Sequence, residues 1–153
     1  MARLNTQLEA KGAEYLTLGE LLIRGIEAYP CYTNQAHYDL IATKGNNSCR
    51  IQVKSRFYTG SNSFPIQKFE CDFVVFVSLN RGYERIKLNG ELGIGEPAFY
   101  VLPVAILDSA QDNRLQWNKV HLHKIDNLLT YQKAWHLISQ FLQTSECHDF
   151  AKI

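Results

Sequence analysis

The stretch Asp72–Leu79, with the sequence DFVVFVSL, is almost entirely apolar and consists mainly of β-branched and aromatic residues. A strand with one solvated face alternates apolar and polar residues, whereas a strand buried on both faces is apolar along its length. The longest uninterrupted apolar run within it, Phe73–Val77, is far too short to cross a bilayer. We therefore predict a central strand of a sheet that is covered on both faces.

Length and composition are those of one globular domain. The chain has 153 residues, of which 46% are hydrophobic and 20% charged, which provides for one sizeable core and is unlike a disordered chain. The N-terminal stretch is polar and lacks the apolar run of a signal peptide. We expect a single domain over residues 1–153, located in the cytoplasm, with no membrane segment. Its four cysteines lie far apart, form no Cys-x-x-Cys pair and are expected as reduced thiols.

Periodicity and turn residues predict the elements around the central strand. A helical pattern runs from Thr6 to Arg24, and Gly25 is a natural C-cap. A second amphipathic helix is expected at about 127–143, with its apolar stripe on Leu128, Tyr131, Trp135, Ile138 and Leu142. Further strands are predicted at Ile26–Tyr32, His37–Thr43, Arg50–Phe57 and Ala98–Val104. The fold class is therefore α/β, with a central mixed sheet flanked by helices.

Two of these predictions concern connections. The segment 44–48 is dense in turn formers, so the strands before and after it should form a hairpin. Pro103 places the end of the last strand at an edge or a bulge of the sheet.

Glu14 lies on the apolar stripe of the first helix, together with Ala10, Leu18 and Leu21. A lone carboxylate on a core-facing stripe is very costly, so Glu14 needs a partner, water or a metal nearby.

Strand alternation brings further polar side chains together. In the segment 50–55, Gln52 and Lys54 share one face of a strand, and Asp39 lies on the adjacent strand of the predicted hairpin. Asp39 and Gln52 can approach each other across the pair, and Glu14 arrives from the helix that packs over it. A polar face of an exposed strand would explain Gln52 and Lys54 equally well. The combination with two acids favours a functional site.

These residue types suit phosphodiester hydrolysis. Mg²⁺ prefers oxygen ligands, commonly one or two carboxylates completed by water and phosphate. Asp39 can bridge the metal and the phosphate, and the Gln52 side-chain carbonyl can complete the shell. Lys54 can orient the attacking water or neutralise charge that develops on the phosphate.

The same residues carry a resemblance to a known family. In order along the chain, Gly12-Ala13-Glu14, Tyr38-Asp39-Leu40 and Ile51-Gln52-Val53-Lys54 resemble the PD-(D/E)XK nuclease superfamily. The likeness extends over about residues 4–104 and is greatest to the small bacterial group I intron-encoded homing endonucleases.

The resemblance implies an αβββαβ restriction-endonuclease-like core and cleavage of double-stranded DNA with Mg²⁺, or Mn²⁺ as a substitute. It also implies a homo-oligomer, a dimer or tetramer. By position it gives catalytic roles to Asp39, Gln52, Lys54 and Glu14, with Asp39, Gln52 and Glu14 as metal ligands.

The sequence departs from the family pattern at two positions. His37-Tyr38 stands where a Pro usually precedes the Asp, and Gln52 replaces the acidic residue of the D/E-x-K motif, which removes one negative charge from the metal site. The leading hypothesis is a site-specific homing endonuclease. The alternatives are a restriction-like or repair and junction nuclease of the same fold, or a non-catalytic DNA-binding module.

DNA contacts must come from local clusters of basic residues, because the net charge of +1 produces no global field. Two segments offer cations and short polar side chains suited to phosphates and base edges. The first contributes Arg56, Tyr58, Ser61, Asn62, Ser63, Gln67 and Lys68. The second contributes Arg81, Tyr83, Arg85 and Lys87, which share one face of a predicted ribbon. A solvated hairpin would explain the second segment equally well.

Overall fold

A five-stranded mixed sheet forms the centre of the computed structural model, which describes residues 6–32, 38–66, 70–83, 93–112 and 119–150, with side chains in the last range described to Thr144. Its strands, in spatial order, are β1 (Glu27–Pro30), β2 (Leu40–Lys44), β3 (Asn47–Arg56), β5 (Phe73–Ser78) and β6 (Ala98–Pro103). The strands β3 and β5 run parallel, and the other neighbours run antiparallel. Every residue of β5 is buried, as its apolar sequence predicts. The expected α/β fold with a central mixed sheet is confirmed.

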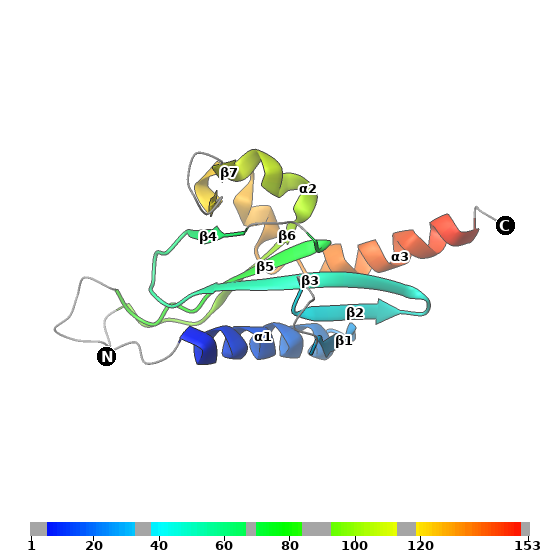
Figure 1. Ribbon diagram of the computed structural model, residues 1–153, viewed down its shortest axis with the longest axis horizontal. Helices are drawn as coiled ribbons and strands as arrows, with labels where there is room; N and C mark the ends of the chain where they lie inside the picture. The colour runs from blue at the N-terminus through cyan, green and yellow to red at the C-terminus, as the bar shows by residue number, and fades with distance from the viewer. Residues whose placement is uncertain (1–5, 33–37, 67–69, 84–92, 113–118, 151–153) are drawn as a thin grey trace.

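Two helices cover one face of this sheet (Figure 1). They are α1 (Thr6–Ile23) and α3 (His136–Phe150). Leu21 from α1 and Ile138 from α3 meet Ile51 and Val75 from the sheet in one core.

The opposite face carries a second, smaller sheet and short helical turns (Figure 1). Its strands are β4 (Ser63–Pro65), β8 (Lys119–His121) and β7 (Gln111–Asp112), and beside them lie α2 (Val104–Leu107), η1 (Asp108–Ala110), η2 (Leu122–Lys124) and η3 (Leu128–Tyr131). Phe64 of β4 stacks on Phe76 of β5, with ring centroids 5.4 Å apart. The αβββαβ pattern would have a helix after the third strand, whereas the described residues of that connection, 57–66 and 70–72, contain β4 and no helix. Alternate residues of β5 face two separate cores: Phe73, Val75 and Val77 belong to the first, and Val74 and Phe76 to the second.

The β2–β3 hairpin confirms the connection predicted at 44–48. Lys44 pairs with Asn47, so that only Gly45 and Asn46 form the turn. Gly45 has φ of 60°, a left-handed conformation that glycine adopts without steric cost. This short turn fixes the register that continues to Leu40 opposite Ile51.

The first helix ends as its sequence predicts. Gly25 has φ of 77°, its N–H donates to Leu22 O at 3.0 Å, and the Ile26 N–H donates to Leu21 O at 3.0 Å. This pair of bonds is the Schellman arrangement, which satisfies the last helical carbonyls. The prediction for Ala10 was wrong: it is exposed, and Ala13, Thr17 and Leu21 are the buried residues.

The second predicted helix begins later than expected. The range 127–143 is wrong at its start, because α3 begins at His136 and residues 128–131 form η3. Asn127 and Lys133 have φ of 56° and 53°, and a left-handed residue interrupts a right-handed helix. The apolar residues in this region are divided between cores: Leu128 and Tyr131 pack against the second core, whereas Trp135 lies in the first.

Cys31, Cys49 and Cys71 form no disulfide bond, and the side chain of Cys147 lies outside those described. Within the described residues, no helix combines the length and apolar character needed to span a membrane.

Asn47 connects the hairpin to the last helix, and its loss should destabilise the fold. Its buried Nδ2 donates to Leu142 O at 2.9 Å. We expect Asn47→Ala to lower the free energy of unfolding by about 1 kcal/mol, measured by urea denaturation. The neighbouring Asn46→Ala, at an exposed position in the turn, is the control and should change it by less than about 0.5 kcal/mol. Equal losses in the two variants would contradict a stabilising role for this bond.

Candidate functional site

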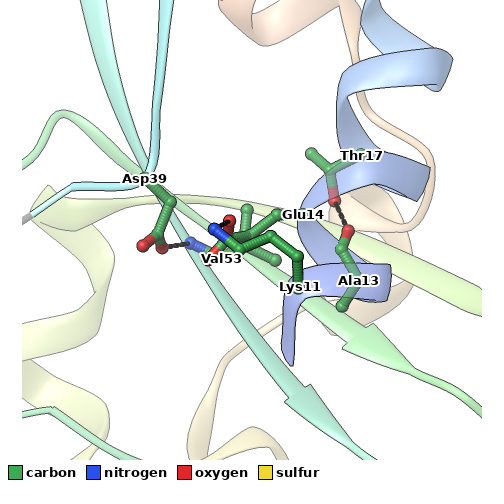
Figure 2. Close-up of polar contacts among 6 residues, drawn as sticks. All are labelled: Lys11, Ala13, Glu14, Thr17, Asp39 and Val53. Atoms are coloured by element: carbon green, nitrogen blue, oxygen red, sulfur yellow. Dashed lines mark hydrogen bonds and ion pairs between the residues drawn. The ribbon is translucent and has the colours of Figure 1, made fainter. Parts of the chain in front are cut away.

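Asp39 lies at the point where β2 stops pairing with β3. Its N–H donates to Ile51 O at 2.9 Å, which continues the ladder by one residue. Beyond that, its side chain replaces the backbone of the neighbouring strand, because Asp39 Oδ2 accepts a hydrogen bond from Val53 N at 2.7 Å (Figure 2). The carboxylate is therefore held in place at the end of the ladder.

A second aspartate acts in the same way on the other side of β3. Asp72, immediately before β5, accepts from Arg50 N through Oδ2 at 2.8 Å, and the Arg50 guanidinium Nε lies 3.5 Å from the same oxygen. Asp72 thus satisfies a β3 N–H just beyond the last residue that pairs with β5. The sequence marked Asp72 only as the start of a strand and gave no sign of this contact.

Glu14 and Lys11 reach from α1 toward β3 (Figure 2). Lys11 Nζ lies 2.9 Å from Glu14 Oε2. The negative charge of Glu14 acts on the Asp39 carboxyl and raises its pKa, so the two side chains lie near each other. Glu14 and Asp39, predicted as one site, are therefore brought together. Lys11 was missed, although the i,i+3 spacing that joins it to Glu14 is visible in the sequence.

The electrostatics of Asp39 favour a neighbouring cation. Burial raises the pKa of this carboxyl above its ordinary value, and the negative charge of Glu14 raises it further. The Val53 N–H and the Lys54 ammonium act in the opposite direction but do not cancel the rise. Burial and the negative charge of Glu14 both lower the tendency of Asp39 to ionise, and a bound cation would relieve both effects.

Gln52 and Lys54 lie on β3 opposite Val74 and Phe76. Both of those β5 residues belong to the second core, so the structure places Gln52 and Lys54 on the same face of the sheet. Burial lowers the pKa of Lys54, and the charge of Asp39 partly offsets this change. Lys54 is thus a half-buried ammonium coupled to the Asp39 carboxylate.

Gln52 is the least engaged of the predicted residues. The β2–β3 register, extended by one residue, puts it opposite Asp39. Its Oε1 accepts a weak, long contact from Cys71 Sγ at 4.0 Å. To bind a metal beside Asp39, the Gln52 amide oxygen would have to turn away from the thiol.

The donor set fits a hard divalent cation better than a soft one. In the part of the chain that the structure describes, no three His, Cys, Asp or Glu side chains are grouped closely enough to hold a metal ion. Asp39 offers a carboxylate with two further oxygen donors nearby: Glu14, which reaches it from α1, and the Gln52 amide, which lies opposite Asp39 in the register but on the face of the second core. Mg²⁺ accepts such a set, because it commonly keeps several waters.

The first segment predicted to contact DNA forms the connection from β3 to β4. Arg56 Nε donates to Ser63 O at 2.8 Å, and Asn62 O accepts from Leu122 N at 2.8 Å. These bonds hold the connection against the second sheet. The side chains of Tyr58 and Ser61 are partly exposed beside it.

The rest of the predicted DNA-binding residues are only partly described. Arg81 and Tyr83 are exposed, and Arg81 forms a bridge with Ile94. Gln67, Lys68, Arg85 and Lys87 lie outside the described residues.

Comparison with solved structures shows which kind of fold this is. The chain resembles a bacterial homing endonuclease, I-Ssp6803I, with a TM-score of 0.61 and 22% sequence identity. The likeness covers 97% of this chain and 99% of that one, so the two folds correspond over nearly their whole lengths. No protein-family model matches the sequence, and no curated protein matches it.

The raised pKa of Asp39 predicts a pH-dependent stability. A carboxyl with a raised folded-state pKa binds protons more tightly in the folded chain, so its contribution is present below the ordinary value of 3.8 and is lost as pH rises through the folded pKa. We expect Asp39→Asn, which retains an acceptor for Val53 N, to remove this decline and to be more stable than the wild type at neutral pH. Urea unfolding across a pH series measures the effect. Parallel curves for the two proteins would contradict it.

Proposed function

We propose that this chain is a site-specific DNA endonuclease of the homing type that hydrolyses phosphodiester bonds of double-stranded DNA with Mg²⁺, or Mn²⁺ as a substitute. The observation that carries the proposal is the Asp39 carboxylate, held at 2.7 Å by the Val53 N–H and coupled to Glu14 and Lys54. The fold likeness to a bacterial homing endonuclease and the motif order Glu14, Asp39, Gln52-x-Lys54 support it. On this proposal the chain is a variant of the PD-(D/E)XK superfamily.

Each residue of the site has a role in this proposal. Asp39 uses Oδ2 for Val53 and would offer its other carboxylate oxygen to the metal, to which Glu14 would add a second negative charge and Gln52 a neutral oxygen. Bound Mg²⁺ supplies Lewis acidity toward the phosphate and lowers the pKa of a coordinated water. Lys54 orients the attacking water and neutralises charge on the phosphate.

The position of Lys54 suits this role. It lies two residues beyond Gln52 on the same face of β3, and burial lowers its pKa. A half-dehydrated ammonium interacts more strongly with a developing charge than a solvated one does. Lys11, in contrast, is exposed and engages Glu14, so it positions the acid.

Duplex DNA is the proposed substrate, and a homo-oligomer is the proposed form of the enzyme. One site per chain cuts one strand, so double-strand cleavage favours a symmetric assembly of at least two chains. The residues that lie at or just beyond the β3 end that follows Lys54 would continue the contact surface along the DNA: Arg56, Tyr58, Ser61, Asn62 and Ser63. Arg81 and Tyr83 extend this surface.

Removing the Lys54 ammonium should abolish most of the cleavage. We expect Lys54→Ala to lower the Mg²⁺-dependent nicking rate by about 10²- to 10³-fold, the usual effect of deleting one group that stabilises the transition state. The assay follows supercoiled or target-bearing duplex DNA with and without EDTA. Lys44→Ala is the matched control, because Lys44 is an exposed lysine at the turn end of the same hairpin. Wild-type cleavage by Lys54→Ala would refute the assignment.

Restoring an acid at position 52 should strengthen metal binding. Gln52→Glu adds a carboxylate beside Asp39, so we expect the Mg²⁺ concentration for half-maximal cleavage to fall by about an order of magnitude, or roughly 1.4 kcal/mol. Gln52→Leu should raise it. If the wild type cuts no DNA with Mg²⁺ or Mn²⁺ and Gln52→Glu does, the natural chain is the non-catalytic DNA-binding alternative. Preferential binding to four-way junctions would favour the junction-nuclease alternative.

A further inference from the structure

The helix α1 has two apolar faces. Its residues Ala13, Thr17 and Leu21 are buried against the sheet. At about 100° per residue, the face directly opposite carries Leu8, Gly12, Tyr15, Gly19, Leu22 and Ile23, with Lys11 and Leu16 at its two margins. None of the six residues on this face is charged. A surface helix ordinarily presents its charged side chains to solvent, so α1 has the pattern of a helix that is covered on both sides.

The outer face of α1 is exposed in the single chain. Leu8 is 71% exposed, Tyr15 56% and Ile23 77%, and Leu16 and Leu22 are also exposed. Figure 1 shows α1 along the outside of the molecule, with the sheet on its inner side and none of the described elements beyond it. A large aromatic side chain can bury about 150 to 250 Å²; with the lower figure for the leucines and the isoleucine, these five leave on the order of 500 Å² of apolar surface in water. A patch of that size on a monomer commonly marks an interaction site.

The two glycines on this face have no packing role within the described chain. A Cβ atom built on Gly12 or Gly19 would meet nothing within 4 Å, and glycine is among the least favourable residues in a helix interior. They are seven residues apart and interleave with Leu8, Tyr15 and Leu22, which have the same spacing. Large apolar residues and glycines thus alternate along the outer face.

We propose that this face packs against the same face of a second copy of the chain, with the two α1 helices antiparallel about a twofold axis. In an antiparallel pair centred near Thr17, Tyr15 lies opposite Gly19 of the other copy, and Leu22 lies opposite Gly12. Each large side chain then fills the space that a glycine leaves. A parallel twofold pair would set each residue opposite itself, which stacks glycine on glycine and leaves voids.

The available area and chemistry fit a second copy. An interface of standard size takes about 800 Å² from each partner, and the apolar side chains supply more than half of it before the flanks of the helix are counted. A nucleic acid would require several cations on this face, whereas α1 offers only Lys11 at its margin, and that lysine is paired with Glu14. The pairing is argued from α1 alone and goes beyond the proposed nuclease activity, so association is tested without DNA or metal.

The first test is sedimentation velocity of the full chain from nanomolar to high micromolar concentration. We expect the wild type to dimerise and Leu22→Lys to raise the dimer dissociation constant at least tenfold. A lysine in the last turn of a helix is favourable, so α1 should remain folded, which circular dichroism checks. Leu129→Lys is the matched control: Leu129 is an exposed leucine of η3, and its replacement should leave the dissociation constant unchanged.

The second test replaces the two glycines by alanine. The replacement should stabilise the monomer but weaken the dimer if the glycines lie in the interface. In the double variant Gly12→Ala/Gly19→Ala, the thermal midpoint of the dilute monomer should rise, because alanine favours the helix. Dimerisation should weaken, because the added methyl groups occupy the space of Tyr15 and Leu22. A wild type that stays monomeric at every concentration overturns the proposal. A dimer whose affinity neither Leu22→Lys nor the double variant changes overturns it as well.

Discussion

The hydrogen bond from Val53 N to the Asp39 carboxylate is the contact on which both the sheet and the site depend. The strand β3 pairs with β2 over its first half and with β5 over its second half. Asp39 comes just before the first residue of β2. Its Oδ2 takes the place of a backbone carbonyl and accepts the hydrogen bond from Val53 N at 2.7 Å. A part-buried N–H without an acceptor would be costly. The geometry of the sheet therefore requires an acceptor at the position where the proposed chemistry requires a carboxylate.

The charges around Asp39 are arranged so that burial is tolerable without a metal. Lys54 attracts Asp39, and Lys11 pairs with Glu14. Gln52 keeps a third negative charge away from this group. Its neighbour Cys71 also remains neutral, because burial raises the pKa of the thiol to about 11. If the proposed site binds a cation, the amide in place of an acid therefore lowers the affinity for it and also lowers the repulsion around Asp39.

The sequence reveals those parts of the fold that depend on local chemistry. Three local features predicted their elements correctly. The apolar run predicted the buried strand β5, the turn residues 44–48 predicted the hairpin, and Gly25 predicted the end of α1. The second sheet and the start of α3 were missed, because Leu128 and Trp135 continue one apolar periodicity while they belong to different cores. For the site, strand alternation was sufficient to group Gln52 with Lys54. The partners of Asp72 and Asp39 could not be inferred, because both are backbone N–H groups, which every residue but proline carries.

The contribution of α3 to the first core has a consequence for the order of events during synthesis. Glu14, Asp39 and Lys54 emerge from the ribosome early, but Trp135, Ile138 and Leu142 complete the first core, against which α1 and one face of β3 pack. The Leu142 carbonyl also accepts a hydrogen bond from Asn47. Contacts between segments so distant in sequence form late and slowly. A nascent chain thus carries its acidic and basic side chains without the framework that aligns them. The candidate site is assembled only when translation has passed the last helix.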